Sequence, residues 1–113
     1  MFNYITREDF ACKCGCGFDT FDFETRAVLQ EAERWFGKPV HMNSGCRCEE
    51  HNRDEGGVPN SQHLLGRAAD FYIEGIDASM VYDYLDKLYP DRFGVGKYTT
   101  FTHVDTRANR ARW

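Results

Sequence analysis

A histidine and an aspartate lie seven residues apart in the segment Ser61–Asp70, and both have side chains that bind metal ions. A straight helix would separate His63 and Asp70 by about 10 Å along its axis, and a straight strand by about 23 Å. Donor atoms about 2 Å from one zinc ion must lie within a few ångströms of each other. The chain would have to turn back between them, and Gly66 can make that turn at low cost. The alternative is a polar turn that leads into a buried strand.

A third residue with metal-binding chemistry is His103, which lies two positions before Asp105. In a strand these two side chains point to the same face. Together, His63, Asp70 and His103 would give two imidazoles and one carboxylate, a set that leaves a fourth zinc position open for water. Zinc lowers the pKa of such a water to about 7 and polarises a carbonyl oxygen. The pattern therefore predicts a catalytic zinc.

These residues resemble the zinc D-Ala-D-Ala carboxypeptidase family, which also contains dipeptidases and phage endolysin endopeptidases. The resemblance rests on Ser61–Asp70, on the His-x-Asp sequence that begins at His103, and on Ser44-Gly45-Cys46-Arg47. It runs from about residue 10 to residue 113 and is closest to short, single-domain, phage-like members. It implies one zinc peptidase domain over residues 1–113, with a small α+β fold.

The resemblance also implies an activity and a cofactor. It implies a zinc metallopeptidase that hydrolyses an amide bond in peptidoglycan stem peptides, either as a carboxypeptidase or as an endopeptidase of cell-wall degradation. His63, Asp70 and His103 would hold the catalytic zinc. The alternative is a zinc-containing module that binds the cell wall or a virion without hydrolysis.

Arg47 matches the position where the family places an arginine near the scissile carbonyl. A guanidinium suits that place because it can stabilise a developing oxyanion or bind a substrate carboxylate through two hydrogen bonds. We therefore expect a catalytic role for Arg47. The alternative is a surface arginine that pairs with Glu49 or Asp54.

The sequence departs from the family pattern at the general base. Better-described members carry an acidic residue three positions before the last histidine, and here that position is Thr100, which cannot act as a base. Asp105 is the substitute catalytic candidate because its side chain faces the same way as that of His103. Alternatively, Asp105 orients a ligand histidine through its other ring nitrogen.

Four further side chains are candidates for substrate binding: Ser44, His51, Gln62 and Tyr98. His51 lies in the polar segment that should rim the cleft, and Tyr98 could place a hydroxyl near the metal. Turn or packing roles are the alternative for Ser44 and Gln62. For Tyr98 the alternative is a half-buried aromatic ring.

The chain has five cysteines: Cys12, Cys14, Cys16, Cys46 and Cys48. An odd number cannot pair completely within one chain. Three interpretations stay open, namely one or two disulfides formed after release, a second, structural zinc bound by four of the five, and free thiols. The Cys-x-Cys spacing counts against zinc, and we favour the disulfide because a bond near Arg47 would rigidify the cleft.

The helices and strands that must position these residues can be predicted from the spacing of apolar residues and from the Gly and Pro residues that end each element. Apolar residues recur at helical spacing from Phe21 to Phe36, and a second helix begins at Asp77–Met80 and ends before Pro90. Strands are expected at 39–44 and 68–73, and a hairpin at 93–98 and 101–105. We also expect a short helical turn at 6–10 and a surface loop at 49–60, with a helical turn within that loop as the alternative. The order predicts an α+β fold with two main helices on a small antiparallel sheet.

Composition limits the class of partner. The 113 residues carry a net charge of −4 and are 42% hydrophobic, which suits one compact domain and does not favour nucleic acid. No segment approaches the length of a membrane span, and the start lacks the pattern of a secretory signal. We expect a monomer that is made in the cytoplasm and acts on the cell wall or in the periplasm after release.

Overall fold

The computed structural model describes residues 7–14, 16, 22–56 and 61–113. Its elements, in chain order, are α1 (Arg7–Phe10), α2 (Phe23–Phe36), β1 (Val40–Ser44), α3 (Glu49–Asp54), the 3-10 helix η1 (Gln62–Leu65), β2 (Ala68–Ile73), α4 (Ala78–Leu88), β3 (Gly94–Lys97), β4 (Thr102–Asp105) and β5 (Ala111–Arg112). The predicted α+β class is confirmed. No helix among these residues is long and apolar enough to cross a membrane.

The five strands form one sheet in the order β1-β2-β4-β3-β5. The pairs β1–β2, β2–β4 and β4–β3 are antiparallel, as the sequence predicts, whereas β3 and β5 are parallel. The sheet is therefore mixed. The parallel edge strand was not predicted, because two residues are too few to carry an alternating pattern.

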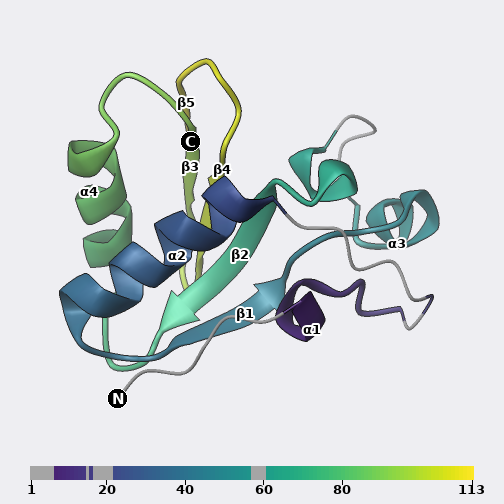
Figure 1. Ribbon diagram of the computed structural model, residues 1–113, viewed down its shortest axis with the longest axis horizontal. Coiled ribbons are helices and arrows are strands. Elements are labelled where there is room, and N and C mark those ends of the chain that lie inside the picture. Colours follow the sequence, from purple (N-terminus) through teal and green to yellow (C-terminus); the bar gives the residue numbers. More distant parts are fainter. Residues whose placement is uncertain (1–6, 15, 17–21, 57–60) are drawn as a thin grey trace.

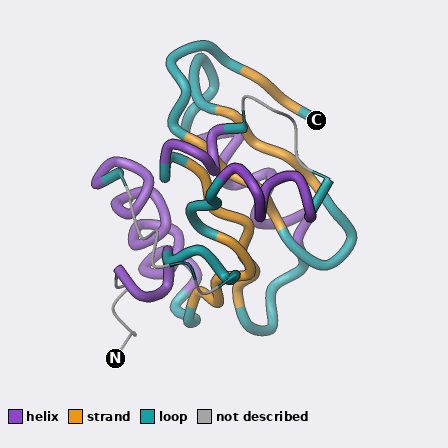
Figure 2. The backbone as a smooth tube through the Cα atoms, turned by 90° about the vertical axis from the view of Figure 1, so that its right-hand side faces the viewer, coloured by secondary structure: helices purple, strands orange, loops and turns teal. Residues whose placement is uncertain are grey.

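Helix α2 lies across one face of the sheet (Figures 1 and 2). The side chain of Asp22 caps its first turn by accepting from the backbone N–H of Thr25 at 3.0 Å. The helix ends at Gly37, whose φ of 66° places it in the left-handed region. Val28 and Leu29 on α2 and Leu85 on α4 share one core with the sheet. The two main helices thus cover a common core, as expected.

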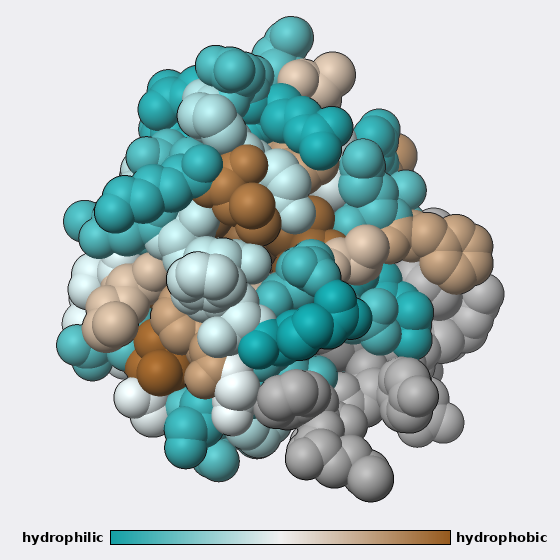
Figure 3. All heavy atoms as spheres, turned by 60° about the vertical axis from the view of Figure 1, so that its left-hand side comes forward, coloured by the Kyte–Doolittle hydropathy of each residue, from teal (hydrophilic) through white to brown (hydrophobic). Residues whose placement is uncertain are grey.

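Large apolar side chains remain exposed where α2 and α4 meet. Trp35, Met80 and Leu88 line a shallow hollow of about 730 Å³. Figure 3 shows this side of the molecule, where apolar side chains lie among polar ones. None of the residues that line this hollow belongs to the groups that could bind a metal ion.

The sequence-based boundaries agree with the structure to within a few residues. The predicted strand 68–73 coincides with β2, and the predicted hairpin corresponds to β3 and β4. The expected loop at 49–60 begins with the short helix α3, which corresponds to the helical turn considered for this segment. Residues 6, 21 and 57–60 of these predictions lie outside the described part of the chain.

Candidate metal centre

Asp70 and His103 face each other on neighbouring strands. They are direct partners in the antiparallel pairing of β2 with β4, and residues directly opposite one another hold their side chains close together. His103 Nδ1 lies 2.8 Å from Asp70 Oδ1. The register of this strand pair therefore brings together two side chains that are 33 positions apart in the sequence.

His63 reaches the same place through the turn that precedes β2. Ser61 caps η1 by accepting from the N–H of His63, and Gly66 ends it with a φ of 67°. The left-handed glycine is the turn that the spacing of His63 and Asp70 predicts. His63 Nε2 lies 3.2 Å from Asp70 Oδ2, so the chain does turn back between these residues.

Each imidazole is held by its outer ring nitrogen. His63 Nδ1 hydrogen-bonds the backbone carbonyl of Gly45, and His103 Nε2 lies 2.7 Å from Asp105 Oδ2. Both inner nitrogens consequently point toward Asp70. Histidines that bind metal ions almost always have their second nitrogen held in this way.

Asp105 is fully buried and both its oxygens are engaged. Besides the contact with His103, it accepts two hydrogen bonds from the guanidinium of Arg107, each 2.7 Å long, and two more from the backbone N–H groups of Arg107 and Gly94. Burial raises the pKa of Asp105, but the hydrogen bonds from His103 and Arg107 outweigh it and hold that pKa well below its ordinary value. Its carboxylate faces the imidazole rather than open solvent.

Arg47 lies beside the three grouped residues. Its guanidinium donates to Asp70 Oδ2 at 3.2 Å, to Ser44 Oγ at 3.1 Å and to Asn52 Oδ1 at 3.3 Å. Of the two predicted partners, Asp54 is not among these contacts, and the side chain of Glu49 lies outside the described part of the structure. The hydroxyl of Ser44 thus helps to hold the guanidinium of Arg47 in place.

A polar cleft of about 460 Å³ opens over this group. The residues that line it are Arg47, Glu55, Gly56, Ser61, Gln62, His63, Asp70, Tyr98, Phe101, His103, Arg107 and Trp113. Of the four predicted substrate contacts, the cleft therefore includes Gln62 and Tyr98. Ser44 and His51 lie outside its lining, and His51 Nε2 is 3.6 Å from Glu55 Oε1.

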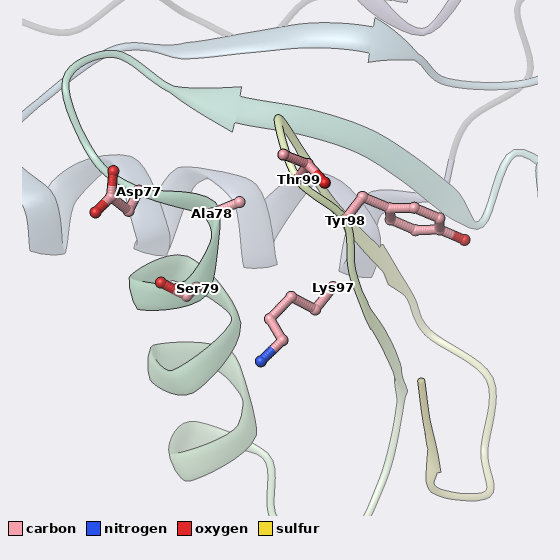
Figure 4. Close-up of a pocket in the computed structure, with 6 residues that line it drawn as sticks. All are labelled: Asp77, Ala78, Ser79, Lys97, Tyr98 and Thr99. Carbon is pink, nitrogen blue, oxygen red and sulfur yellow. The ribbon is translucent and has the colours of Figure 1, made fainter.

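Tyr98 stands between this cleft and a second hollow. Figure 4 shows the second hollow, which lies between the start of α4 and the end of β3, with Lys97 and Tyr98 pointing in different directions. The Tyr98 ring stacks on Phe101 at 4.4 Å, and its hydroxyl accepts from Trp113 Nε1 at 2.9 Å. Its position in the wall is therefore fixed by aromatic neighbours.

The cleft residues that sequence reasoning did not predict include Glu55, Arg107 and Trp113. Arg107 follows Asp105 by two positions, a charge pattern that could have suggested the pair. Trp113 packs against His103 with ring centroids 4.9 Å apart, and nothing local in the sequence indicates that contact. Glu55 follows the last residue of α3, the short helix within the segment that the sequence predicts as a surface loop with room for a helical turn.

The three grouped side chains fit a zinc ion. The potential ligand atoms of His63, Asp70 and His103 all lie within 4.8 Å of one another, and two imidazoles with a carboxylate form a donor set typical of catalytic zinc. Burial raises the pKa of Asp70, but hydrogen bonds with His103 and His63 outweigh it and lower that pKa well below its ordinary value. The carboxylate is thus held in the ionised form that binds a cation.

None of the five cysteines is in a disulfide in this structure. The Sγ atoms of Cys12, Cys14 and Cys48 are 3.4 to 3.8 Å apart, well beyond the roughly 2.05 Å of a disulfide bond. The disulfide that we favoured from the sequence is therefore wrong for this structure. Four of the cysteines instead form a second group that could hold a metal ion.

Comparison with known families agrees with this geometry. A family model described as Peptidase M15 matches residues 3–105. Together with the fold and the donor set, the match defines a metallopeptidase of a zinc-binding class. The chain belongs to the peptidase M15 family, the zinc D-Ala-D-Ala carboxypeptidase family. No curated protein matches the chain.

Proposed function

We propose that the protein is a zinc-dependent peptidase that hydrolyses an amide bond in peptidoglycan stem peptides, as a carboxypeptidase or an endopeptidase. One observation carries the proposal: His63, Asp70 and His103 converge in a polar cleft that also contains Arg47. A zinc ion bound there would supply an activated water and polarise the substrate carbonyl. Membership of the peptidase M15 family supports the substrate class.

In this proposal Arg47 binds the substrate oxygen on which negative charge develops. Its guanidinium lies beside Asp70 and lines the cleft, and donors aimed at such an oxygen contribute strongly to catalysis. Ser44 and Asn52 hold the guanidinium in one orientation. Gln62 and Tyr98 contribute polar groups that would position the peptide.

Asp105 acts in this proposal by orienting His103. It lacks exposed surface, and its two oxygens already accept hydrogen bonds from Arg107 and Gly94 as well as facing His103. A buried carboxylate with these partners cannot reach a water in the cleft. This arrangement supports the second of the two roles predicted for Asp105.

Glu55 is the proton acceptor in this proposal. Among the described residues that line the cleft, Glu55 and Asp70 are the acidic ones, and Asp70 belongs to the metal group. Thr100 is exposed in the turn between β3 and β4 and carries no carboxylate. The side chain of Glu55 is 54% exposed and close to His51, so it can exchange protons with solvent.

The test is digestion of purified peptidoglycan followed by mass spectrometry of the muropeptides. We expect zinc-loaded protein to release shortened stem peptides, and His63→Ala to release none. Loss of a terminal residue identifies a carboxypeptidase, whereas cleavage within a cross-link identifies an endopeptidase. Peptidoglycan that is bound but chemically unchanged would refute hydrolysis and favour the binding module that the absence of an acidic residue at position 100 suggests.

A further inference from the structure

A group of four cysteines lies outside the catalytic cleft. The ligand atoms of Cys12, Cys14, Cys16 and Cys48 all lie within 4.8 Å of one another. The first three come from the segment after α1, and Cys48 immediately precedes α3. Cys46 is buried elsewhere and is not part of this group.

Three of the four sulfur atoms lie at separations close to those of a tetrahedral metal site, and the fourth, that of Cys16, lies within 4.8 Å of them. A zinc ion with four sulfur ligands at about 2.3 Å requires sulfur atoms about 3.8 Å apart. The observed Sγ separations are 3.4 Å for Cys12 and Cys14, 3.8 Å for Cys12 and Cys48, and 3.7 Å for Cys14 and Cys48. The short Cys-x-Cys spacing therefore does not prevent these side chains from converging.

Backbone N–H groups point at two of the sulfur atoms. The N–H of Cys48 donates to Cys12 Sγ at 3.5 Å, and the N–H of His51 donates to Cys48 Sγ at 3.4 Å. Outer hydrogen bonds of this kind orient metal ligands and offset their charge. Cys14 and Cys16 are exposed, so a metal ion can enter from solvent.

We propose that Cys12, Cys14, Cys16 and Cys48 bind a second, structural zinc ion. Four thiolates close the coordination sphere, which is the composition of structural rather than catalytic zinc sites. The proposal stands independently of the peptidase activity, because it uses none of the residues of the catalytic cleft.

The second zinc would fix the loop that carries Arg47. This loop is attached on one side to the N-terminal segment, where the N–H of Cys46 donates to the carbonyl of Phe10 at 2.8 Å. On the other side, the N–H of Arg47 donates to the carbonyl of His63 at 2.9 Å. A metal ion that links Cys48 to Cys12 would hold the base of this loop and so keep Arg47 beside the catalytic group.

The first test is the metal content of purified protein, measured by inductively coupled plasma mass spectrometry. We expect about two zinc ions per chain in the wild type, about one in Cys14→Ser, about one in His63→Ala and none in the double variant. Cys46→Ala is the matched control and should keep both. A wild type whose entire zinc content disappears in His63→Ala overturns the proposal, and so does iron in place of zinc, because iron also binds four thiolates.

The second test needs no variant that could fail to fold. Titration of the zinc-loaded wild type with a mercurial that blocks thiols should release one zinc ion as the cysteines react, detected with a zinc-sensitive dye. The same titration of His63→Ala should release all of its zinc. Thiols that react without releasing zinc would overturn the second site while leaving the peptidase proposal intact. A failure of the cleft to bind zinc would instead appear as unchanged zinc content in His63→Ala.

Discussion

Two aspartates at the metal centre have different surroundings. Asp70 contacts both histidines and the guanidinium of Arg47 at the edge of the cleft, whereas Asp105 is enclosed behind His103. Only the first can reach an ion shared with both imidazoles. The difference separates a ligand from a positioning residue, although both carboxylates are buried and both contact His103.

Asp105→Asn tests the positioning role. The amide keeps the size of the side chain but removes the charge that holds His103 and Arg107. Because partners of this kind tune metal affinity, we expect zinc affinity to fall about 10- to 100-fold. Competition with a chromophoric chelator measures the affinity, and peptidase activity at saturating zinc should recover substantially. Intact zinc affinity with abolished hydrolysis would instead identify Asp105 as the base.

Glu55→Gln tests the proton acceptor. The substitution preserves shape and removes the basic oxygen, so the hydrolytic rate should fall by about 10²- to 10⁴-fold, the usual contribution of a general base. Zinc content should stay at the wild-type level, since Glu55 lies outside both metal groups. Asp54→Asn, one position earlier at the end of α3, is the matched control. Equal activity of the two variants would exclude Glu55 from the reaction.

At the scale of elements, the close approach of α1 to the end of β1 supports the metal centre. A Cβ atom on Gly45 would lie 2.5 Å from the Cα and 2.7 Å from the carbonyl oxygen of Phe10. The same glycine provides the carbonyl that holds His63. Gly45 therefore allows α1 to pack closely against the end of β1, and its carbonyl orients the imidazole of His63.

Gly45→Ala should consequently lower both stability and metal affinity. Backbone atoms cannot move aside as a flexible side chain can, so we expect a loss of about 1 to 3 kcal/mol in the free energy of unfolding. Urea denaturation measures this loss, and chelator competition measures the metal affinity. Gly37→Asn is the control, because nothing lies within 4 Å of its Cβ position and asparagine tolerates the left-handed conformation. A neutral Gly45→Ala would show that this contact relaxes freely.

An ion pair connects α4 to the edge strand β5. Asp86 accepts from Arg112 Nε at 2.7 Å, and the same guanidinium donates to the carbonyls of Tyr89 and Phe93. The hydrogen bond and charge of Arg112 lower the pKa of Asp86. A lowered pKa means that the pair stabilises the fold above the ordinary pKa of aspartate and that this contribution is lost as the pH falls.

Asp86→Asn should therefore destabilise the protein at pH 7 and not in acid. Because the carboxylate is 40% exposed, the loss should be at most about 1 kcal/mol. The difference between wild type and variant should shrink as the pH falls below about 4. Thermal unfolding at several pH values measures it. A difference that is constant across this range would mean that the charge of Asp86 contributes nothing.

At the scale of the whole molecule, local sequence patterns predicted the main helices and strands. They did not predict contacts that depend on how distant parts of the chain pack together. Strand β2 was predicted because Ala68–Ile73 is apolar except for Asp70, and helix α2 because its apolar residues recur at helical spacing. The spacing of His63 and Asp70 around a glycine left a polar turn open as the alternative, and the family resemblance favoured their grouping as metal ligands. In contrast, β5 forms because the backbone N–H groups on either side of Arg112, those of Ala111 and Trp113, donate to carbonyls in and next to β3. No local sequence pattern reveals this pairing.

Some residues of the cleft were not predicted for the same reason, namely that long-range packing places them there. Glu55, Arg107 and Trp113 reach the cleft through the paths of α3 and of the C-terminal segment. The convergence of Cys48 on Cys12 likewise depends on how β1 packs beside α1, and from the sequence we preferred a disulfide there. Residues whose place is fixed by distant packing are those that sequence spacing could not assign.

Metal removal tests how far the whole fold depends on both groups. A ligand that binds only the folded state stabilises it by about 2.7 kcal/mol at 100 times its dissociation constant, which corresponds to a rise in melting temperature on the order of 10 °C for a domain of this size. Chelator-treated protein should therefore melt at a lower temperature, and added zinc should restore it. Magnesium should not, because nitrogen and sulfur ligands select zinc. His63→Ala should keep part of the zinc-dependent rise through Cys12 and its neighbours, and adding Cys14→Ser should abolish it. A melting temperature unchanged by chelator would show that neither group contributes metal-dependent stability.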